Sequence, residues 1–107
     1  FMCPFIQKKH NPEVGSRYAD AVMEGDGKVV GFVSYSTQTK FVQLLAVSSQ
    51  CYSQGYGAEL LSYAERQIKL GGGDVVKLCI TPKNDKAAAF YRRQGYCSSD
   101  TLFIKKI

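Results

Sequence analysis

The chain has 107 residues, of which 45% are hydrophobic and 21% are charged, and its formal net charge is +5. This length corresponds to one domain of roughly 100–200 residues, and the composition is that of a globular protein, so a multidomain protein is excluded. No apolar run approaches the roughly 18 residues of a membrane-spanning helix, so we expect no membrane partner. Phe1–Ile6 lacks a preceding charged segment, which argues against a signal peptide. A chain that begins with Phe1 indicates a piece of a longer protein.

The positive charges are scattered in pairs such as Arg92-Arg93 and Lys105-Lys106. They favour anionic partners in general, without distinguishing nucleic acid, an acidic protein and a phosphorylated cofactor.

The four cysteines contain no C-x-x-C pair, so their spacing indicates neither a zinc site nor a redox dithiol. We therefore expect free thiols in a reducing compartment, the cytoplasm or the nucleus, and no metal.

The first half of the chain is predicted to form strands. Residues 1–17 are the least patterned and are expected to be an irregular lead-in to a single domain. Two β-rich runs, Tyr18–Glu24 and Val29–Tyr35, flank a Gly-Asp-Gly-Lys turn, which predicts a hairpin because Asp-Gly supplies the positive φ angles of a tight turn. After a polar turn, Phe41–Val47 is almost continuously apolar, as expected of a central strand covered on both faces.

The second half alternates helices and strands. From Gly57 to Ile68, small and apolar residues recur at helical spacing, and the glycine triplet at 71–73 ends this helix. A strand over Val75–Thr81 is followed by Asn84, which fits the N-cap of a second helix. Gly95 fits the left-handed position after that helix, and Thr101–Lys105 is predicted to be the last strand. Hairpins make antiparallel neighbours and strand–helix–strand crossovers parallel ones, so we expect an α/β fold with a mixed sheet and helices on its faces.

An uncharged, glycine-bearing segment leads into the first predicted helix. The backbone N–H groups at such a helix start have no intrahelical acceptor, and with the helix dipole they form an anion site that needs no lysine. Alternatively, Gly55 and Gly57 merely allow a tight turn. Two known phosphate motifs do not fit, because Leu60 occupies the third glycine position of a dinucleotide fingerprint and Gly57-Ala58-Glu59 stands where a P-loop has Gly-Lys-Ser/Thr.

The chain resembles the GNAT superfamily of N-acetyltransferases over about residues 18–107, in several stretches. The run from Gln54 to Ala58 lies in a stretch similar to the family's acyl-CoA pyrophosphate loop, [QR]-x-x-G-x-[GA]. Tyr52 replaces the Gln or Arg that opens this motif, and Ser53 replaces a common Gly. The run from Asn84 to Tyr96 is similar to its second signature, N-x-x-A-x-x-F-Y-x-x-x-G-[FY]. The preceding Ala-Val-Ser-Ser resembles the histone and protein acetyltransferase branch. The resemblance implies a GNAT-like acyl-CoA N-acyltransferase fold, with a shortened N-terminal helical region because residues 1–17 cannot hold the family's first helices.

The resemblance also implies roles for individual residues, with acetyl-CoA as the acetyl donor. The loop that would hold the CoA pyrophosphate consists of Gln54, Gly55, Tyr56, Gly57 and Ala58. Ala46 and Val47 would pair their backbone with the pantetheine arm, Asn84 would face the cofactor, and Tyr91 would stand near the sulfur. A phenol with a pKa of about 10 can give the departing thiolate a proton. Alternatively, Asn84 is a plain helix cap and Tyr91 is a packed helix aromatic.

The sequence assigns no general base. In the histone acetyltransferase branch a glutamate on the strand corresponding to Phe41–Val47 takes the proton of the amine, and the corresponding residue here is Phe41. A lysine amine has a pKa of about 10.4 and must lose a proton before it attacks. Glu24, Asp26 and His10 are candidates, and a water chain from backbone carbonyls is another. His10 is otherwise expected to be a surface residue.

The expected function is direct transfer of acetyl from acetyl-CoA to a primary amine, with a protein lysine favoured over a small amine. The strand Phe41–Val47 has no carboxylate, and the N-terminal region is too short for the family's first helices. These two features leave open a second hypothesis, an acyl-CoA-binding interaction module that catalyses little. A third, nucleic-acid binding through scattered basic and tyrosine side chains, is disfavoured. A partner subunit or a missing N-terminal region is expected to complete the acceptor site.

Overall fold

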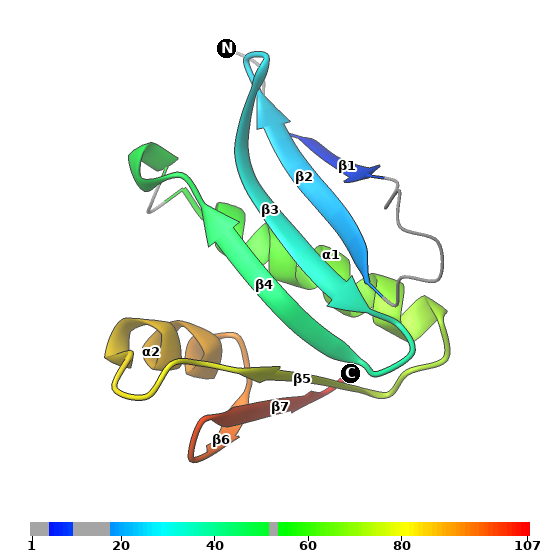
Figure 1. The fold of residues 1–107 in the computed structure, drawn as a ribbon, viewed down its shortest axis with the longest axis vertical. Helices are drawn as coiled ribbons and strands as arrows, with labels where there is room; N and C mark the ends of the chain where they lie inside the picture. The colour runs from blue at the N-terminus through cyan, green and yellow to red at the C-terminus, as the bar shows by residue number, and fades with distance from the viewer. Residues whose placement is uncertain (1–4, 10–17, 52–53) are drawn as a thin grey trace.

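The computed structural model describes residues 5–9, 18–51 and 54–107 (Figure 1). Its elements, in chain order, are β1 (Phe5–Lys9), β2 (Ala19–Gly25), β3 (Lys28–Ser36), β4 (Phe41–Val47), the 3₁₀ turn η1 (Ser49–Cys51), α1 (Tyr56–Leu70), β5 (Val75–Cys79), α2 (Asp85–Arg93), β6 (Cys97–Ser99) and β7 (Leu102–Lys106). The strands form one sheet in the order β1-β2-β3-β4-β5-β7-β6. Only the β4–β5 pair is parallel among the described strands, so the predicted mixed sheet is confirmed.

The hairpin between β2 and β3 forms at the predicted Asp-Gly turn. Gly25 lies opposite Lys28, and the two residues between them, Asp26 and Gly27, have φ angles of 54° and 75°. Two successive positive φ angles give the turn the twist of the strands that it joins. The predicted left-handed residue after α2 is also present, since Gly95 has a φ angle of 96°.

The structure differs from the prediction at three places: two strands were not predicted, and one predicted strand ends earlier. Phe5–Lys9 forms strand β1 at the sheet edge, inside the segment expected to be irregular, because Ile6 lies opposite Met23 and packs against the core. Strand β6 was not predicted, since three residues are too few to show a period of two. Strand β5 ends at Cys79 rather than Thr81, and the amide of Ile80 donates to the carbonyl of Thr101 outside the ladder.

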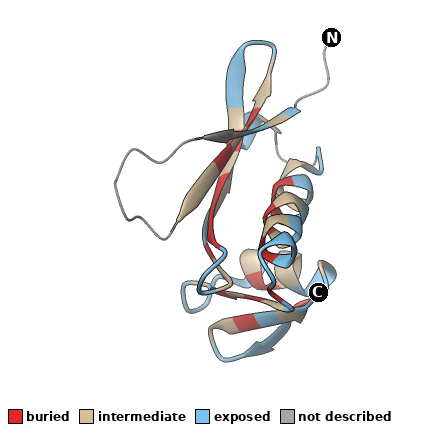
Figure 2. Ribbon diagram, turned by 90° about the vertical axis from the view of Figure 1, so that its right-hand side faces the viewer, coloured by how far each residue is buried: buried red, intermediate tan, exposed pale blue. Residues whose placement is uncertain are grey.

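The core lies between the sheet and α1 (Figure 2). Alternate residues of β2 and β3 point toward this helix, and the apolar face of the helix covers them. The buried side chains at this interface are Ala21, Met23, Val33 and Tyr35 from the strands and Leu60, Leu61, Ala64 and Ile68 from the helix. In the part of the chain that the structure describes, no helix is long and apolar enough to cross a membrane.

Helix α1 and strand β4 both lie close to Gly31 of β3. A Cβ atom there would lie 2.8 Å from Cδ1 of Leu60 and 2.9 Å from the carbonyl oxygen of Ala46. We expect Gly31→Ala to lower the free energy of unfolding by about 1–3 kcal/mol, because the added methyl overpacks a buried contact. Urea unfolding of Gly31→Ala beside Val29→Thr, an exposed position of the same strand, measures this. Equal stability of the two variants would contradict it.

Candidate functional site

Helix α1 begins at a left-handed glycine with no side-chain cap. Gly55 has a φ angle of 79° and a ψ angle of 8°, and its carbonyl accepts the first helical hydrogen bond from the amide of Glu59 at 3.1 Å. The amides of Gly57 and Ala58 have no acceptor among the described residues. This helix start therefore has the donors and the dipole that an anion site needs. That the loop binds a pyrophosphate stays a prediction.

The loop that contains Gly57 lies against Val47, the last residue of β4, and against Phe90 of α2. A Cβ atom on Gly57 would be 3.4 Å from the Phe90 ring and 3.7 Å from Cγ2 of Val47. The fold thus brings together three predicted segments: the loop, the end of β4 and the second signature. Gln54, by contrast, is exposed, and Tyr52 and Ser53 lie outside the described residues.

Strands β4 and β5 separate soon after they meet. Their only ladder pair in the described chain is Phe41 opposite Lys77, where the Lys77 amide donates to the Lys40 carbonyl at 2.8 Å. Farther along β4, Ala46 and Val47 pair only with β3 on their other side. Figure 1 shows β4 and β5 diverging with α2 beside the opening. An extended ligand could pair with this β4 edge, as predicted for the pantetheine arm, and that role stays a prediction.

Asn84 caps α2 as the sequence predicted. Its Oδ1 accepts a hydrogen bond from the amide of Ala87 at 3.2 Å, and its side chain is exposed. The predicted contact between Asn84 and the cofactor is a separate role, which this cap neither requires nor prevents.

Tyr91 is half-buried in an aromatic cluster. Its ring centroid lies 5.1 Å from that of Phe90, 5.8 Å from Tyr96 and 6.0 Å from Phe103 of β7. Burial raises the pKa of the Tyr91 phenol above its ordinary value. The hydroxyl is therefore protonated at neutral pH and is available as a proton donor, while its acid role stays a prediction.

No carboxylate projects from β4, which confirms the gap seen at Phe41. Of the candidate bases, Glu24 lies on β2, which β3 separates from β4, and Asp26 lies in the exposed hairpin turn. His10 lies outside the described residues. The base therefore remains unassigned.

A buried polar cluster was not predicted. Glu65 of α1 accepts hydrogen bonds from the hydroxyl of Tyr96 and from Nζ of Lys105. The sequence does not indicate this contact, because 31 and 40 residues separate Glu65 from its partners along the chain. A period or a motif reports local neighbours only, so no local signal could have found this cluster.

A hollow of about 450 Å³ lies between β1 and α1, lined by Ile6, Ala58, Glu59, Ser62 and Arg66. None of these lining residues belongs to β4 or to α2, which carries Tyr91. The described residues also contain no group of three metal-binding side chains. Cys51, Cys79 and Cys97 have free thiols.

Comparisons with known proteins agree with this geometry. The model of the Acetyltransferase (GNAT) family matches residues 3–96. The chain belongs to this family. An aminoalkylphosphonate N-acetyltransferase from Salmonella typhimurium is 30% identical over 90 residues, which cover 77% of this chain and 58% of that protein. The chain spans about half the length of the curated relatives that it matches, from 48% to 58%.

Solved structures of the family share the fold. An IAA acetyltransferase from Bacillus cereus has a TM-score of 0.83 at 15% identity, with 98% of this chain and 100% of that chain covered. The PaiA N-acetyltransferase from Thermoplasma acidophilum, solved with coenzyme A, has a TM-score of 0.76 at 20% identity, with 85% and 62% covered. These likenesses confirm the predicted GNAT fold. The resemblance to the histone acetyltransferase branch stays a prediction.

The Asn84 cap leads to a stability prediction. Asn84→Ala removes the only side-chain acceptor at the start of α2 in the described chain, so we expect a loss of about 1 kcal/mol in the free energy of unfolding. Asn84→Ser keeps a capping hydroxyl and should stay close to the parent protein. Thermal unfolding of the two variants measures the difference, and equal losses in both would contradict a capping role.

Proposed function

We propose that this GNAT domain transfers acetyl from acetyl-CoA directly to the primary amine of a small molecule. The observation that carries the proposal is the meeting of three parts at one opening. These are the amides of Gly57 and Ala58, which have no acceptor among the described residues, the edge of β4 that pairs with no described strand beyond Phe41, and α2 with its half-buried phenol. The Gly57 contacts with Val47 and Phe90 join these parts.

Acetyl-CoA would supply the acetyl group as a thioester, and the residues present fit such a ligand. The amides of Gly57 and Ala58 are suited to hold the pyrophosphate, since no described residue occupies them. The backbone of Ala46 and Val47 offers hydrogen bonds to an extended amide-bearing arm.

Tyr91 is the proposed general acid. The leaving thiolate becomes a better leaving group when it receives a proton, and a phenol that burial keeps protonated can supply one. No described cysteine has a histidine partner, which supports direct transfer over an acylated enzyme.

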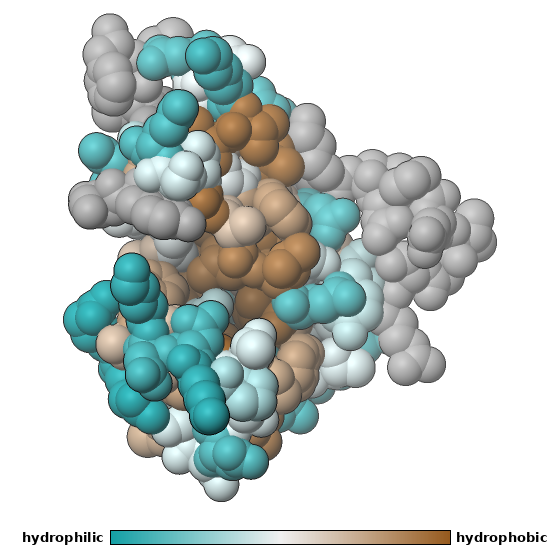
Figure 3. Space-filling view, turned by 60° about the vertical axis from the view of Figure 1, so that its left-hand side comes forward, coloured by the Kyte–Doolittle hydropathy of each residue, from teal (hydrophilic) through white to brown (hydrophobic). Residues whose placement is uncertain are grey.

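The acceptor is proposed to approach the sheet from the face opposite α1. Val22, Phe32, Leu44 and Ala46 point away from the core on this face, because their strand neighbours point into it. Leu44 is 50% exposed, and Figure 3 shows apolar side chains gathered in the middle of this side of the molecule. We call these four residues the open face.

A polar pair lies beside the open face. The Ser34 hydroxyl donates to Oε1 of Gln43 at 3.3 Å, next to a register shift after Ser34 in the pairing of β3 with β4. Such bulges re-aim side chains and are frequent next to active sites. The pair lies close to where β4 leaves β5, so an amine on the open face can reach both polar groups and the thioester.

The choice of a small amine over a protein lysine rests on the relatives. The aminoalkylphosphonate N-acetyltransferase acts, by its name, on a small amine with an anionic group. An anionic acceptor also suits a chain with a net charge of +5. The free thiols support activity in a reducing compartment, the cytoplasm or the nucleus.

The acid role of Tyr91 has a direct test. We expect Tyr91→Phe to lower kcat about 10²–10⁴-fold while acetyl-CoA still stabilises the fold, because the ring remains and only the proton donor is lost. A panel of aminoalkylphosphonates and a lysine peptide, assayed by release of free CoA, measures the rate. Tyr63→Phe removes a hydroxyl from α1 and serves as the control. An unchanged rate in Tyr91→Phe would remove the acid role, and binding without turnover on any amine would favour the binding-module hypothesis.

The cofactor loop has a test with a matched pair of glycines. Gly55 and Gly72 have φ angles of 79° and 94°, and neither would bring a new Cβ within 4 Å of another atom. Alanine at either position should therefore cost a similar backbone strain of about 1 kcal/mol. We expect only Gly55→Ala to reduce the thermal stabilisation by acetyl-CoA, which is about 2.7 kcal/mol at 100 times the dissociation constant. Equal stabilisation of both variants would argue against the loop as the binding site.

A further inference from the structure

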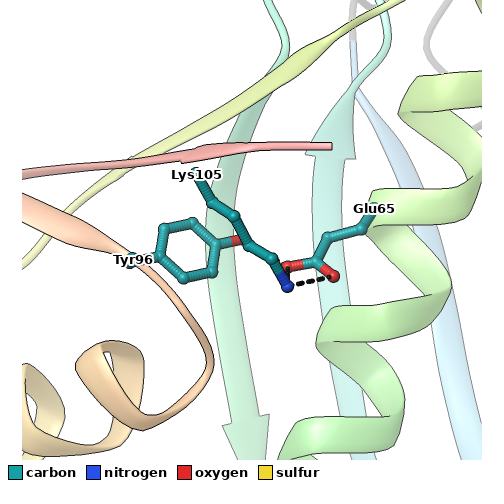
Figure 4. A network of polar contacts seen from close by, with 3 residues as sticks. All are labelled: Glu65, Tyr96 and Lys105. Carbon is teal, nitrogen blue, oxygen red and sulfur yellow. Dashed lines mark hydrogen bonds and ion pairs between the residues drawn. The ribbon is translucent and has the colours of Figure 1, made fainter.

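Glu65, Tyr96 and Lys105 join three parts of the fold that are distant in sequence (Figure 4). The Tyr96 hydroxyl donates to Oε2 of Glu65 at 2.7 Å, and Lys105 Nζ lies 3.2 Å from Oε1 and 3.3 Å from Oε2. Glu65 belongs to α1, Tyr96 follows α2, and Lys105 belongs to β7. We call these three residues the clamp.

The clamp is well shielded from water. Tyr96 is 3% exposed, and the side chains of Glu65 and Lys105 are 12% and 29% exposed. Burial and then the bond to Glu65 raise the pKa of Tyr96, so its hydroxyl remains a donor. Charge-assisted hydrogen bonds of this kind are stronger than neutral ones, and removing one partner leaves the other unsatisfied.

Lys105 reaches the clamp by crossing the end of α2. A Cβ atom on Gly95 would lie 3.4 Å from Cε of Lys105, so the glycine leaves room for the lysine stem. The ammonium group also lies 5.7 Å from the centroid of the Tyr96 ring. The lysine thus covers the tyrosine from one side while Glu65 holds its hydroxyl.

Tyr96 also forms one wall around Tyr91. The two rings meet edge to face at 5.8 Å between centroids, and the Tyr96 amide donates to the Tyr91 carbonyl at 3.0 Å. Phe103, on the other side, lies 6.0 Å from Tyr91 and carries the Arg92 guanidinium over its ring. Any shift of Tyr96 therefore moves both the backbone and the ring environment of Tyr91.

We propose that the clamp is a set of positioning residues that holds the Tyr91 phenol in place relative to the start of α1. Glu65 lies on α1, whose first turn forms the predicted cofactor loop. Because Glu65 holds Tyr96 and Tyr96 packs against Tyr91, the position of the Tyr91 ring is fixed relative to that loop. The Tyr96 ring alone would fill the core, whereas its hydroxyl is needed to fix the end of α2 to α1. This inference rests on the proposed acid role of Tyr91.

A double-mutant cycle tests the coupling. Tyr96→Phe removes the hydroxyl and keeps the ring, and we expect it to lower kcat between about tenfold and a hundredfold with little change in KM for acetyl-CoA. In the Tyr91→Phe background the same change should have almost no further effect, because the clamp acts through Tyr91. An equal loss in both backgrounds would overturn the proposal.

A measurement without catalysis tests the same point. ¹³Cζ-tyrosine NMR follows the titration of the Tyr91 phenol, whose ring contacts Tyr96 and Phe103. The charged groups around this cluster are Glu65 of α1 and Lys105 of β7, which contact Tyr96, and Arg92 of α2, which lies over Phe103. We expect the Tyr91 pKa to move toward its ordinary value of about 10 in Tyr96→Phe, because the loosened wall admits water. An unchanged pKa with a lowered melting temperature would show a stabilising role only and would overturn the proposal.

The remaining variants separate the outcomes. Lys105→Met removes the charge from the more exposed end of the clamp and should lower kcat with little change in KM for acetyl-CoA, whereas Lys106→Met, its exposed neighbour on β7, should not. Tyr63→Phe controls for loss of a tyrosine hydroxyl elsewhere on α1. If Tyr91→Phe retains full activity, the acid role fails, and the NMR titration still decides whether the clamp positions the ring.

Discussion

The early separation of β4 from β5 is the constraint on which the rest of the site depends. A parallel pair normally continues its ladder, but here Phe41 and Lys77 make the only pair in the described chain. The backbone of β4 beyond this point has an unpaired edge inside the molecule rather than at its rim. Such an edge is costly unless it is solvated or paired by a ligand, because buried backbone groups need hydrogen-bond partners. The fold therefore holds open a position for an extended polar ligand.

Two helices border this opening, and their contacts explain why both are needed. The start of α1 approaches Val47 and Phe90 at Gly57. Two turns later on the same helix, the Glu65 carboxylate accepts hydrogen bonds from Lys105 of β7 and from Tyr96, which follows α2. One helix thus carries both the amides proposed to bind an anion, at its first turn, and the Glu65 anchor. A single rigid element relates the two ends of the site.

Local patterns predicted most of the fold and the segments of the site. The Asp26-Gly27 turn, the helical stripe that includes Leu60 and Ala64, and the Asn84 cap each depend on neighbours within a few residues, so the sequence displays them. Strand β1 was not predicted, because Ile6 is its one described residue that packs against the core and its partner Met23 is distant in sequence. The contacts of Glu65 with Tyr96 and Lys105 were not predicted either, because these partners are also distant in sequence. The identity of the base and the acceptor depends on which side chains line the open face, and pattern reading supplies no distances there.

The clamp residues are far apart along the chain, and this separation also indicates when their contacts form during folding. Hairpin β2–β3 closes a two-residue loop, whereas Glu65 must find partners 31 and 40 residues away. Closing longer loops costs more chain entropy, so contacts between distant segments tend to form after local ones. The amides at the start of α1 can be in place while α2 is still loosely attached. The aromatic cluster around Tyr91 is therefore expected to reach its final packing late in folding, after the hairpin and α1 have formed.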